Sequence, residues 1–133
     1  MHKEKEIEKA IIEYLISRKA IVESMQWGSI MVKRGPKSYR VNLQTDGCPD
    51  LMVLYFGRFI GIEVKKDQKE VDKWLKLEER YNNYEVLPKS YEREKQQIIY
   101  SQKIKQHWGE FLITHSVSEV MQLLNKKTLW DNL

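Results

Sequence analysis

The stretch GCPDLMVLYFGRFIGIEVKK, residues 47–66, decides the fold of this chain. It holds two apolar runs, LMVLYF (51–56) and FIGIEV (59–64), which are separated by Gly57-Arg58 alone. A two-residue loop with glycine first suits a type II′ turn. The stretch therefore predicts an antiparallel β-hairpin, and the apolar character of both faces of its first strand places it in the middle of a sheet.

The second strand of this hairpin carries charges on one face only. Its alternation puts Ile62 and Val64 on one side, and Glu63 and Lys65 on the other. A carboxylate and an ammonium on a buried sheet face need partners, because an unpaired buried charge is costly.

The expected hairpin register supplies such a partner. With Phe56 opposite Phe59, Asp50 falls opposite Lys65 and becomes a diagonal neighbour of Glu63. Diagonal neighbours have Cα atoms roughly 7–8 Å apart. Two carboxylates so placed repel one another unless a proton or a cation lies between them.

Hard oxygen ligands at this separation suit Mg²⁺ or Mn²⁺, which keep water ligands for a substrate. Lys65 would then hold or deprotonate an attacking water, or stabilise charge that develops on a phosphate. Gly61 on the same face leaves space for a close backbone approach. The alternative is a structural salt bridge from Asp50 or Glu63 to Lys65.

The remaining sequence predicts an α/β domain on a mixed sheet, with the order α-β-β-β-β-α-α-β-α. Helices are expected over 3–18, 67–83 and 91–108, the third of them ending at Gly109 as the C′ residue. A short strand at 110–114 and a last helix that opens with the capping box Ser116-x-x-Glu119 complete the chain.

Composition bounds the class of protein. The 133 residues are 41% hydrophobic and 32% charged, with a net charge of +4 and a pI near 9.1, which fits one globular domain and permits a polyanionic partner. A single cysteine, Cys48, excludes an internal disulfide and a multi-cysteine zinc site. A charged N-terminus and the lack of a long apolar run lead us to expect a soluble, cytoplasmic protein with no membrane segment.

The segment MVKRGPKSYR (31–40) is a second candidate site, because its cations suit the phosphates of DNA. A solvated hairpin tip is the alternative. The candidate DNA-binding residues are Lys33, Arg34, Lys37 and Arg40, together with Lys66 beside the central site.

The central stretch resembles the core of the PD-(D/E)xK nuclease superfamily, with Pro49-Asp50 and Glu63-Val64-Lys65 as its two halves. More narrowly, it is similar to the VRR-NUC family, whose pattern joins G-x-PD, a short glycine-containing hairpin and G-x-E-x-K. The resemblance implies a restriction-endonuclease-like core over residues 1–133. It also implies a metal-dependent DNA endonuclease, with junction and flap DNA as candidate preferred substrates, that forms a homodimer by analogy with other small nucleases.

The resemblance also assigns roles to residues. It implies that Asp50, Glu63 and the Val64 carbonyl are metal ligands and that Lys65 is the catalytic lysine. A glutamate on the first helix completes the family's site; the pattern indicates Glu4, and Glu8, one turn further on, competes with it.

Two further features relate to the family pattern. Ser101-Gln102 resembles a family element, so Gln102 is expected to touch substrate or to orient Lys65. Residues 67–98 depart from the pattern and are interpreted as a helical insertion: a lid, a DNA clamp, a dimerisation arm or a plain solvated hairpin. A nucleic-acid-binding or assembly module without catalysis, on the same fold, remains the alternative function.

Overall fold

The computed structural model describes residues 3–25, 29–42 and 46–126, and the side chains of all of these except 29–34 and 39–42. Among these residues, five strands precede the second helix, one more than the expected order contains. The elements are α1 (Lys3–Ser17), β1 (Ile21–Ser24), β2 (Ser29–Arg34), β3 (Lys37–Asn42), β4 (Leu51–Tyr55), β5 (Arg58–Val64), α2 (Gln68–Asn82), the 3₁₀ turn η2 (Lys89–Tyr91), α3 (Glu92–Gln106), β6 (Glu110–Thr114) and α4 (Val117–Asn125).

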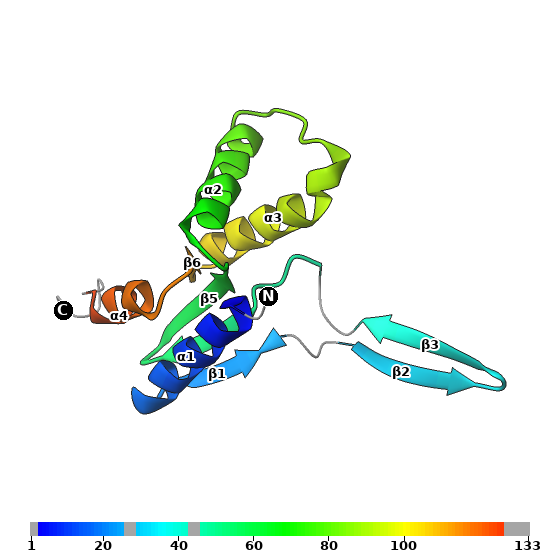
Figure 1. The fold of residues 1–133 in the computed structure, drawn as a ribbon, viewed down its shortest axis with the longest axis horizontal. Helices are drawn as coiled ribbons and strands as arrows, with labels where there is room; N and C mark the ends of the chain where they lie inside the picture. The colour runs from blue at the N-terminus through cyan, green and yellow to red at the C-terminus, as the bar shows by residue number, and fades with distance from the viewer. Residues whose placement is uncertain (1–2, 26–28, 43–45, 127–133) are drawn as a thin grey trace.

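A four-stranded mixed sheet forms the centre, in the order β1-β4-β5-β6. The β1–β4 and β4–β5 pairs are antiparallel and the β5–β6 pair is parallel. The expected α/β class with helices on a mixed sheet is confirmed, and the hairpin strands β4 and β5 are central. Strands β2 and β3 form a separate two-stranded ribbon (Figure 1).

Each face of the sheet has its own hydrophobic cluster. Helices α1 and α4 cover one face, where Ile62 and Val64 pack with Ile11 and Val120. Helices α2 and α3 cover the other face, where Trp74 and Ile98 pack near Phe111 and Ile113 of β6. The face that carries Glu63 is therefore covered by α2 and α3, the helices that lie above the sheet in Figure 1.

Residues 67–98, interpreted from the sequence as an insertion, contribute α2 and the first half of α3. Because β5 and β6 are parallel, the chain must cross over the sheet between them, and such a crossover requires a dozen or more residues. These helices make that crossover and bury Val71, Trp74, Leu77 and Ile98.

The β4–β5 hairpin differs from its expected register by two residues. Tyr55 pairs with Arg58, so Phe56-Gly57 is the loop and not Gly57-Arg58. Both loop residues have positive φ, 46° and 79°, which matches a type I′ turn and not the expected type II′. A shift of two residues keeps every side chain on its face, and Asp50, just beyond the ladder, comes opposite Glu63 instead of Lys65.

Arg58 gives the physical reason for this register. Its guanidinium donates to both carboxylate oxygens of Glu110 on β6, at 2.8 and 2.7 Å, and to the carbonyls of Leu123 and Leu124 at the end of α4. An arginine in the loop would not take part in the ladder, whereas here it lies in β5 opposite Tyr55.

The observed helix ends agree in part with those that the sequence predicts. Ser116 caps α4 as expected, with its Oγ accepting from the Glu119 N–H at 3.4 Å. The C′ residue of α3 is Trp108, with φ of 67°, and not Gly109. Gly109 follows it and donates to the Ile104 carbonyl at 2.9 Å, which completes a Schellman motif. No helix among the described residues is long and apolar enough to cross a membrane.

Candidate active site

The ends of β4 and β5 bring together the three side chains that the sequence selected. Asp50 Oδ2 accepts from the Val64 N–H at 2.8 Å, and Lys65 Nζ lies 4.0 Å from Glu63 Oε1. The backbone of Lys65 is fixed as well, because its N–H donates to the Thr114 carbonyl at 2.8 Å. The carboxylates border a cavity of about 310 Å³, which is lined by Met25, Gly47, Cys48, Pro49, Asp50, Glu63, Arg93 and Gln97.

Glu63 is the most buried ionisable group of this site, with 2% of its surface exposed. Burial, and next the charge of Asp50, raises its pKa to about 8. Burial also raises the pKa of Asp50, although the Val64 N–H, Lys65 and Arg93 act in the opposite direction. Burial raises the pKa of both carboxyl groups, and the charge of Asp50 raises that of Glu63 further, so a cation between the two would be favoured.

Gln97 on α3 is a site residue that the sequence reasoning missed. The Trp74 indole donates to Gln97 Oε1 at 3.0 Å, and Gln97 Nε2 donates to Glu63 Oε1 at 3.0 Å. An indole nitrogen can only donate, so Trp74 fixes which end of the Gln97 amide faces Glu63. One oxygen of Glu63, Oε1, is thereby occupied. The other, Oε2, is buried and has no hydrogen-bond partner in the part of the chain that the structure describes.

Arg93 is the second missed residue. Arg93 lines the cavity and is exposed to solvent. Its positive charge lowers the pKa values of Glu4, Asp50 and Glu63. Arg93 and Gln97 are one helical turn apart, so both project from the same side of α3. That spacing was available in the sequence, but the position of α3 over the sheet was not.

The two candidate glutamates of α1 occupy different environments. Partial burial of its carboxyl group raises the pKa of Glu4, and the charge of Asp50 raises it further while Lys65 lowers it. The beginning of α1 thus lies within electrostatic reach of the site (Figure 1). Glu8 is buried further along α1, where Ser24 of β1 donates to its Oε1 at 3.4 Å.

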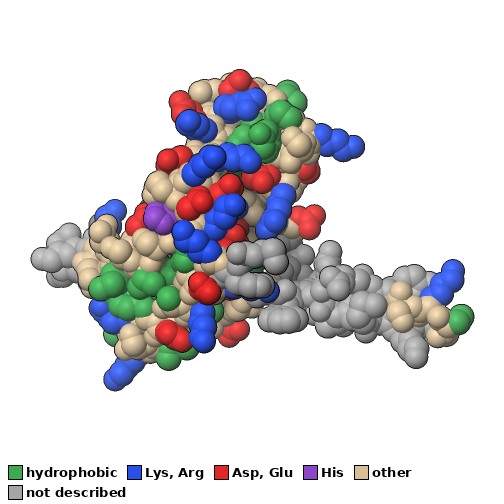
Figure 2. All heavy atoms as spheres, in the orientation of Figure 1, with side chains coloured by type: hydrophobic (Ala, Val, Ile, Leu, Met, Phe, Trp, Pro, Cys, Tyr) green, Lys and Arg blue, Asp and Glu red, His purple; other side chains and the backbone are tan. Residues whose placement is uncertain are grey.

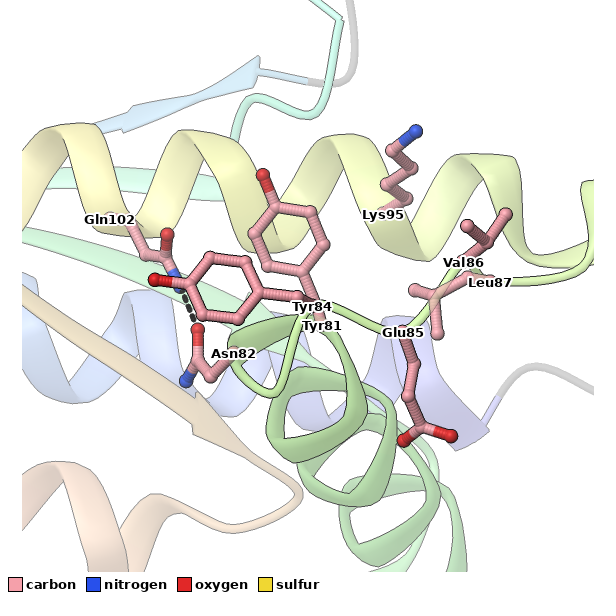
Figure 3. A pocket seen from close by; sticks show the side chains of 8 residues that line it. All are labelled: Tyr81, Asn82, Tyr84, Glu85, Val86, Leu87, Lys95 and Gln102. Atoms are coloured by element: carbon pink, nitrogen blue, oxygen red, sulfur yellow. Dashed lines mark hydrogen bonds between the residues drawn. The ribbon is translucent and has the colours of Figure 1, made fainter.

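Gln102 is placed away from Glu63. Its Nε2 donates to Asn82 Oδ1 at 2.7 Å, at the end of α2 (Figure 3). Both amides border a separate hollow of about 480 Å³ that also includes Tyr81, Tyr84 and Lys95. The glutamine of α3 that contacts Glu63 is Gln97, because the buried side of this helix carries Gln97, Ile98, Ser101 and Ile104.

Gly61 also differs from its expected role. A Cβ at this position would lie 2.8 Å from Ile104 Cδ1 and 2.9 Å from Pro49 Cγ. The space beside Gly61 is filled by the side chains of Ile104 and Pro49, so the expected close approach of a backbone is wrong.

The candidate DNA-binding residues are described only in part. Lys66 is exposed directly after the site, and Lys37 is exposed at the tip of the β2–β3 ribbon. The side chains of Lys33, Arg34 and Arg40 lie outside the described residues.

A metal ion would find few protein ligands here. Within residues 3–25, 29–42 and 46–126, no three His, Cys, Asp or Glu side chains are grouped closely enough to hold one. Asp50 and Glu63 form a pair, and the buried Oε2 of Glu63, which accepts no hydrogen bond from a described residue, is the atom that a cation would contact. A pair of carboxylates fits Mg²⁺ or Mn²⁺, which are commonly bound through one or two carboxylates with water in the remaining positions.

Comparisons with known proteins agree with this architecture at the level of the fold. No family model matches the chain, and no curated protein matches it. A solved structure described as a VRR_NUC domain is similar to it, with a TM-score of 0.53 and 18% sequence identity, over 95% of this chain and 98% of the other. The chain therefore has a VRR-NUC-like fold.

Proposed function

From its VRR-NUC-like fold, we propose that this protein is a divalent-metal-dependent nuclease that hydrolyses phosphodiester bonds of DNA. The observation that carries the proposal is Glu63, whose buried Oε2 has no hydrogen-bond partner among the described residues, although Asp50 and Lys65 lie close by. A structural salt bridge does not account for this arrangement, because a buried polar atom without a partner costs about 1–3 kcal/mol.

The donor set indicates which groups would hold the metal. Asp50 and Glu63 would supply carboxylate oxygens, Val64 a backbone carbonyl, and Glu4 would approach from α1. Mg²⁺ or Mn²⁺ bound there would polarise the phosphodiester and lower the pKa of a water molecule.

The residues around the metal position have separable tasks. Lys65, with 15% of its side chain exposed, is placed to orient or deprotonate the attacking water, or to stabilise charge on the phosphate. Arg93 at the edge of the cavity would bind a phosphate oxygen. Gln97 acts through Glu63, whose carboxylate it holds in one orientation.

Cleavage assays test this proposal. Supercoiled, linear, flap and four-way-junction DNA are incubated with Mg²⁺, with Mn²⁺ and with EDTA. We expect metal-dependent cutting that Asp50→Asn and Lys65→Ala reduce by about 10²–10⁴-fold, the range for loss of acid–base or charge-stabilising groups. Glu13→Gln, on an exposed part of α1, is the control variant and is expected to cut normally.

The outcomes separate the two functions considered. If no substrate is cut and DNA binding is unaffected by EDTA, the chain is a binding module and not a nuclease. Isothermal titration adds a second readout, since Glu63→Gln should abolish divalent-metal binding; unchanged binding would place the metal elsewhere. The panel of substrates also reports any preference for junctions or flaps.

We further propose that the protein acts as a homodimer, so that two sites reach two strands. A row of apolar side chains crosses three strands at the end of the sheet remote from Glu63: Ile21 on β1, Leu54 on β4 and Phe59 on β5. These three side chains are 60%, 47% and 38% exposed. A contiguous exposed apolar patch of this kind is typical of a protein–protein contact.

A further inference from the structure

We propose that one face of α2, which carries Lys69, Lys73, Lys76 and Arg80, binds the phosphate backbone of the DNA that leads to the site. We call these four residues the α2 basic face. The inference rests on the proposed nuclease function and adds the surface along which the substrate lies.

The spacing of the four cations places them in one row. They follow one another at intervals of four, three and four residues, so they lie within about 60° of arc on the helix. From Lys69 to Arg80 the row extends about 16 Å along the axis, at 1.5 Å per residue. Along that length a DNA duplex carries about ten phosphates. The row is therefore long enough to contact several phosphates of one strand.

The row starts at the active site. Lys65 belongs to the site, Lys66 is exposed after it, and Asp67 caps α2 by accepting from the Glu70 N–H at 2.9 Å. Glu70, in the first turn of α2, lies within electrostatic reach of Glu4. DNA that contacts Lys65 would therefore also contact the first turn of α2, which begins three residues later.

The cations of the row are available to a ligand. Lys69, Lys73 and Lys76 are exposed, and within the part of the chain that the structure describes no ion pair occupies them. Lys73 lies 5.3 Å from the centre of the Tyr91 ring, which orders its side chain without neutralising it. Arg80 and Glu85 form a half-exposed pair at 3.7 Å, which contributes little and can open.

The surroundings of the row indicate which polyanion it suits. All four cations line a hollow of about 830 Å³ beside Tyr91, together with Glu70 and Asp72. Figure 2 shows Lys and Arg side chains over the region of α2 and α3, with Asp and Glu between them. A narrow basic row between acidic residues fits a single phosphate backbone, whereas a broad anionic membrane surface would also meet the acids and be repelled.

The test compares two variants with the same change in charge. Lys69, Lys73 and Lys76 are replaced together by Gln in one, and exposed Lys19, Lys103 and Lys105 by Gln in the other. Binding of a short duplex in EDTA is measured by fluorescence anisotropy over a range of salt concentrations. We expect the slope of log K against log salt to fall by about 2 to 3 in the first variant and by less than 1 in the control.

A second readout separates binding from chemistry. Metal-dependent hydrolysis of bis(p-nitrophenyl) phosphate, which is too small to reach α2, should be equal in both variants and the original protein. If the original protein cuts DNA and both variants bind it with the same slope, the inference is wrong while the nuclease stands. If DNA is bound through these lysines but never cut, the inference holds and the nuclease proposal fails. If neither variant nor the original protein binds DNA, both are wrong.

Discussion

Gly47 shows how a single residue fixes the candidate site. Its φ is 83°, and a Cβ there would lie 2.2 Å from the Gln96 carbonyl oxygen and 2.8 Å from the Gln97 nitrogen. The loop before Asp50 therefore touches the backbone of α3 directly, one residue before Gln97. This contact holds Asp50 and Gln97 in a fixed relation across the cavity.

We expect Gly47→Ala to lower the free energy of unfolding by about 2–4 kcal/mol, from backbone overlap and the left-handed conformation together. Gly35→Ala is the matched control, because Gly35 has φ of 61° and a Cβ added there would meet no atom within 4 Å, so only about 1–2 kcal/mol is expected. Urea unfolding measures the loss in the free energy of unfolding for both variants. Equal losses would mean that the approach to α3 is not tight.

The raised pKa of Glu63 predicts a dependence of stability on pH. The folded protein keeps a proton on Glu63 up to about pH 8, whereas the unfolded chain releases it near the ordinary value of 4.5. The stabilisation is therefore complete below 4.5 and is lost as the pH rises toward 8. The slope approaches about 1.4 kcal/mol per pH unit within this window.

Urea unfolding in EDTA across this window measures the effect. Glu63→Gln, which is neutral at every pH and keeps an oxygen for the Gln97 donor, should remove most of the fall. A fall of the same size in the variant would assign it to other groups, such as Asp50 or Glu4, whose pKa values are also raised.

At the scale of elements, the β4–β5 hairpin holds the two halves of the site in register. Its type I′ loop requires positive φ at both positions, which Gly57 adopts freely and Phe56, with φ of 46°, does not. The ring of Phe56 is 86% exposed and makes an edge contact with Tyr55. The loop is thus strained at Phe56 and is held by the strands on either side.

We expect Phe56→Asn to raise the free energy of unfolding by up to about 1 kcal/mol, because Asn-Gly is the preferred pair for a type I′ turn. Phe56→Val, in which a β-branched residue takes the same φ, should lower it. Thermal unfolding followed by circular dichroism compares the two. If Phe56→Val were more stable than Phe56→Asn, side-chain packing would contribute more to stability here than the conformational preference of the turn.

The crossover helices are the other element that the site depends on. Gln97 and Arg93 reach Glu63 only because α2 and α3 return the chain across the sheet to β6. Trp74 links the two helices to the site, since its indole fixes the amide of Gln97. The crossover thus has a role in the site as well as in the topology.

At the scale of the whole molecule, the two covering layers leave part of the sheet bare. Helix α3 covers the Glu63 end of its face, whereas the row Ile21, Leu54 and Phe59 at the other end is exposed. Trp108, in the turn before β6, is 96% exposed. This bare end is where we expect a second copy of the chain to bind.

Leu54→Lys is expected to convert a dimer into monomers, because a charge in the middle of an apolar contact is desolvated without a partner. Ile16→Lys is the matched control, since Ile16 is 61% exposed on α1 and outside this row. Sedimentation velocity gives the mass in solution of the original protein and of the two variants. A monomeric original protein, or a dimer that only Ile16→Lys disrupts, would contradict this interface.

The sequence by itself determined the local features of the protein. The period of two along β5 placed Glu63 and Lys65 on the face opposite Ile62 and Val64, and every register that preserves burial keeps that assignment. Asp50 lies on the same face as Glu63 and Lys65 in both the expected and the observed register, because the two registers differ by two residues. Helix periodicity predicted α1, α2 and α3 to within a few residues.

Only the tertiary structure decided what depends on distant partners. Gly57 is compatible both with the expected type II′ turn and with the observed type I′ turn. The register depends on Arg58, which contacts Glu110 and the end of α4, more than 50 residues further along the chain. Gln97 is the glutamine that reaches Glu63, because the packing of α3 on the sheet turns one side of that helix toward the site. Periodicity describes how one element presents its side chains, but which of them meet is set by packing between elements.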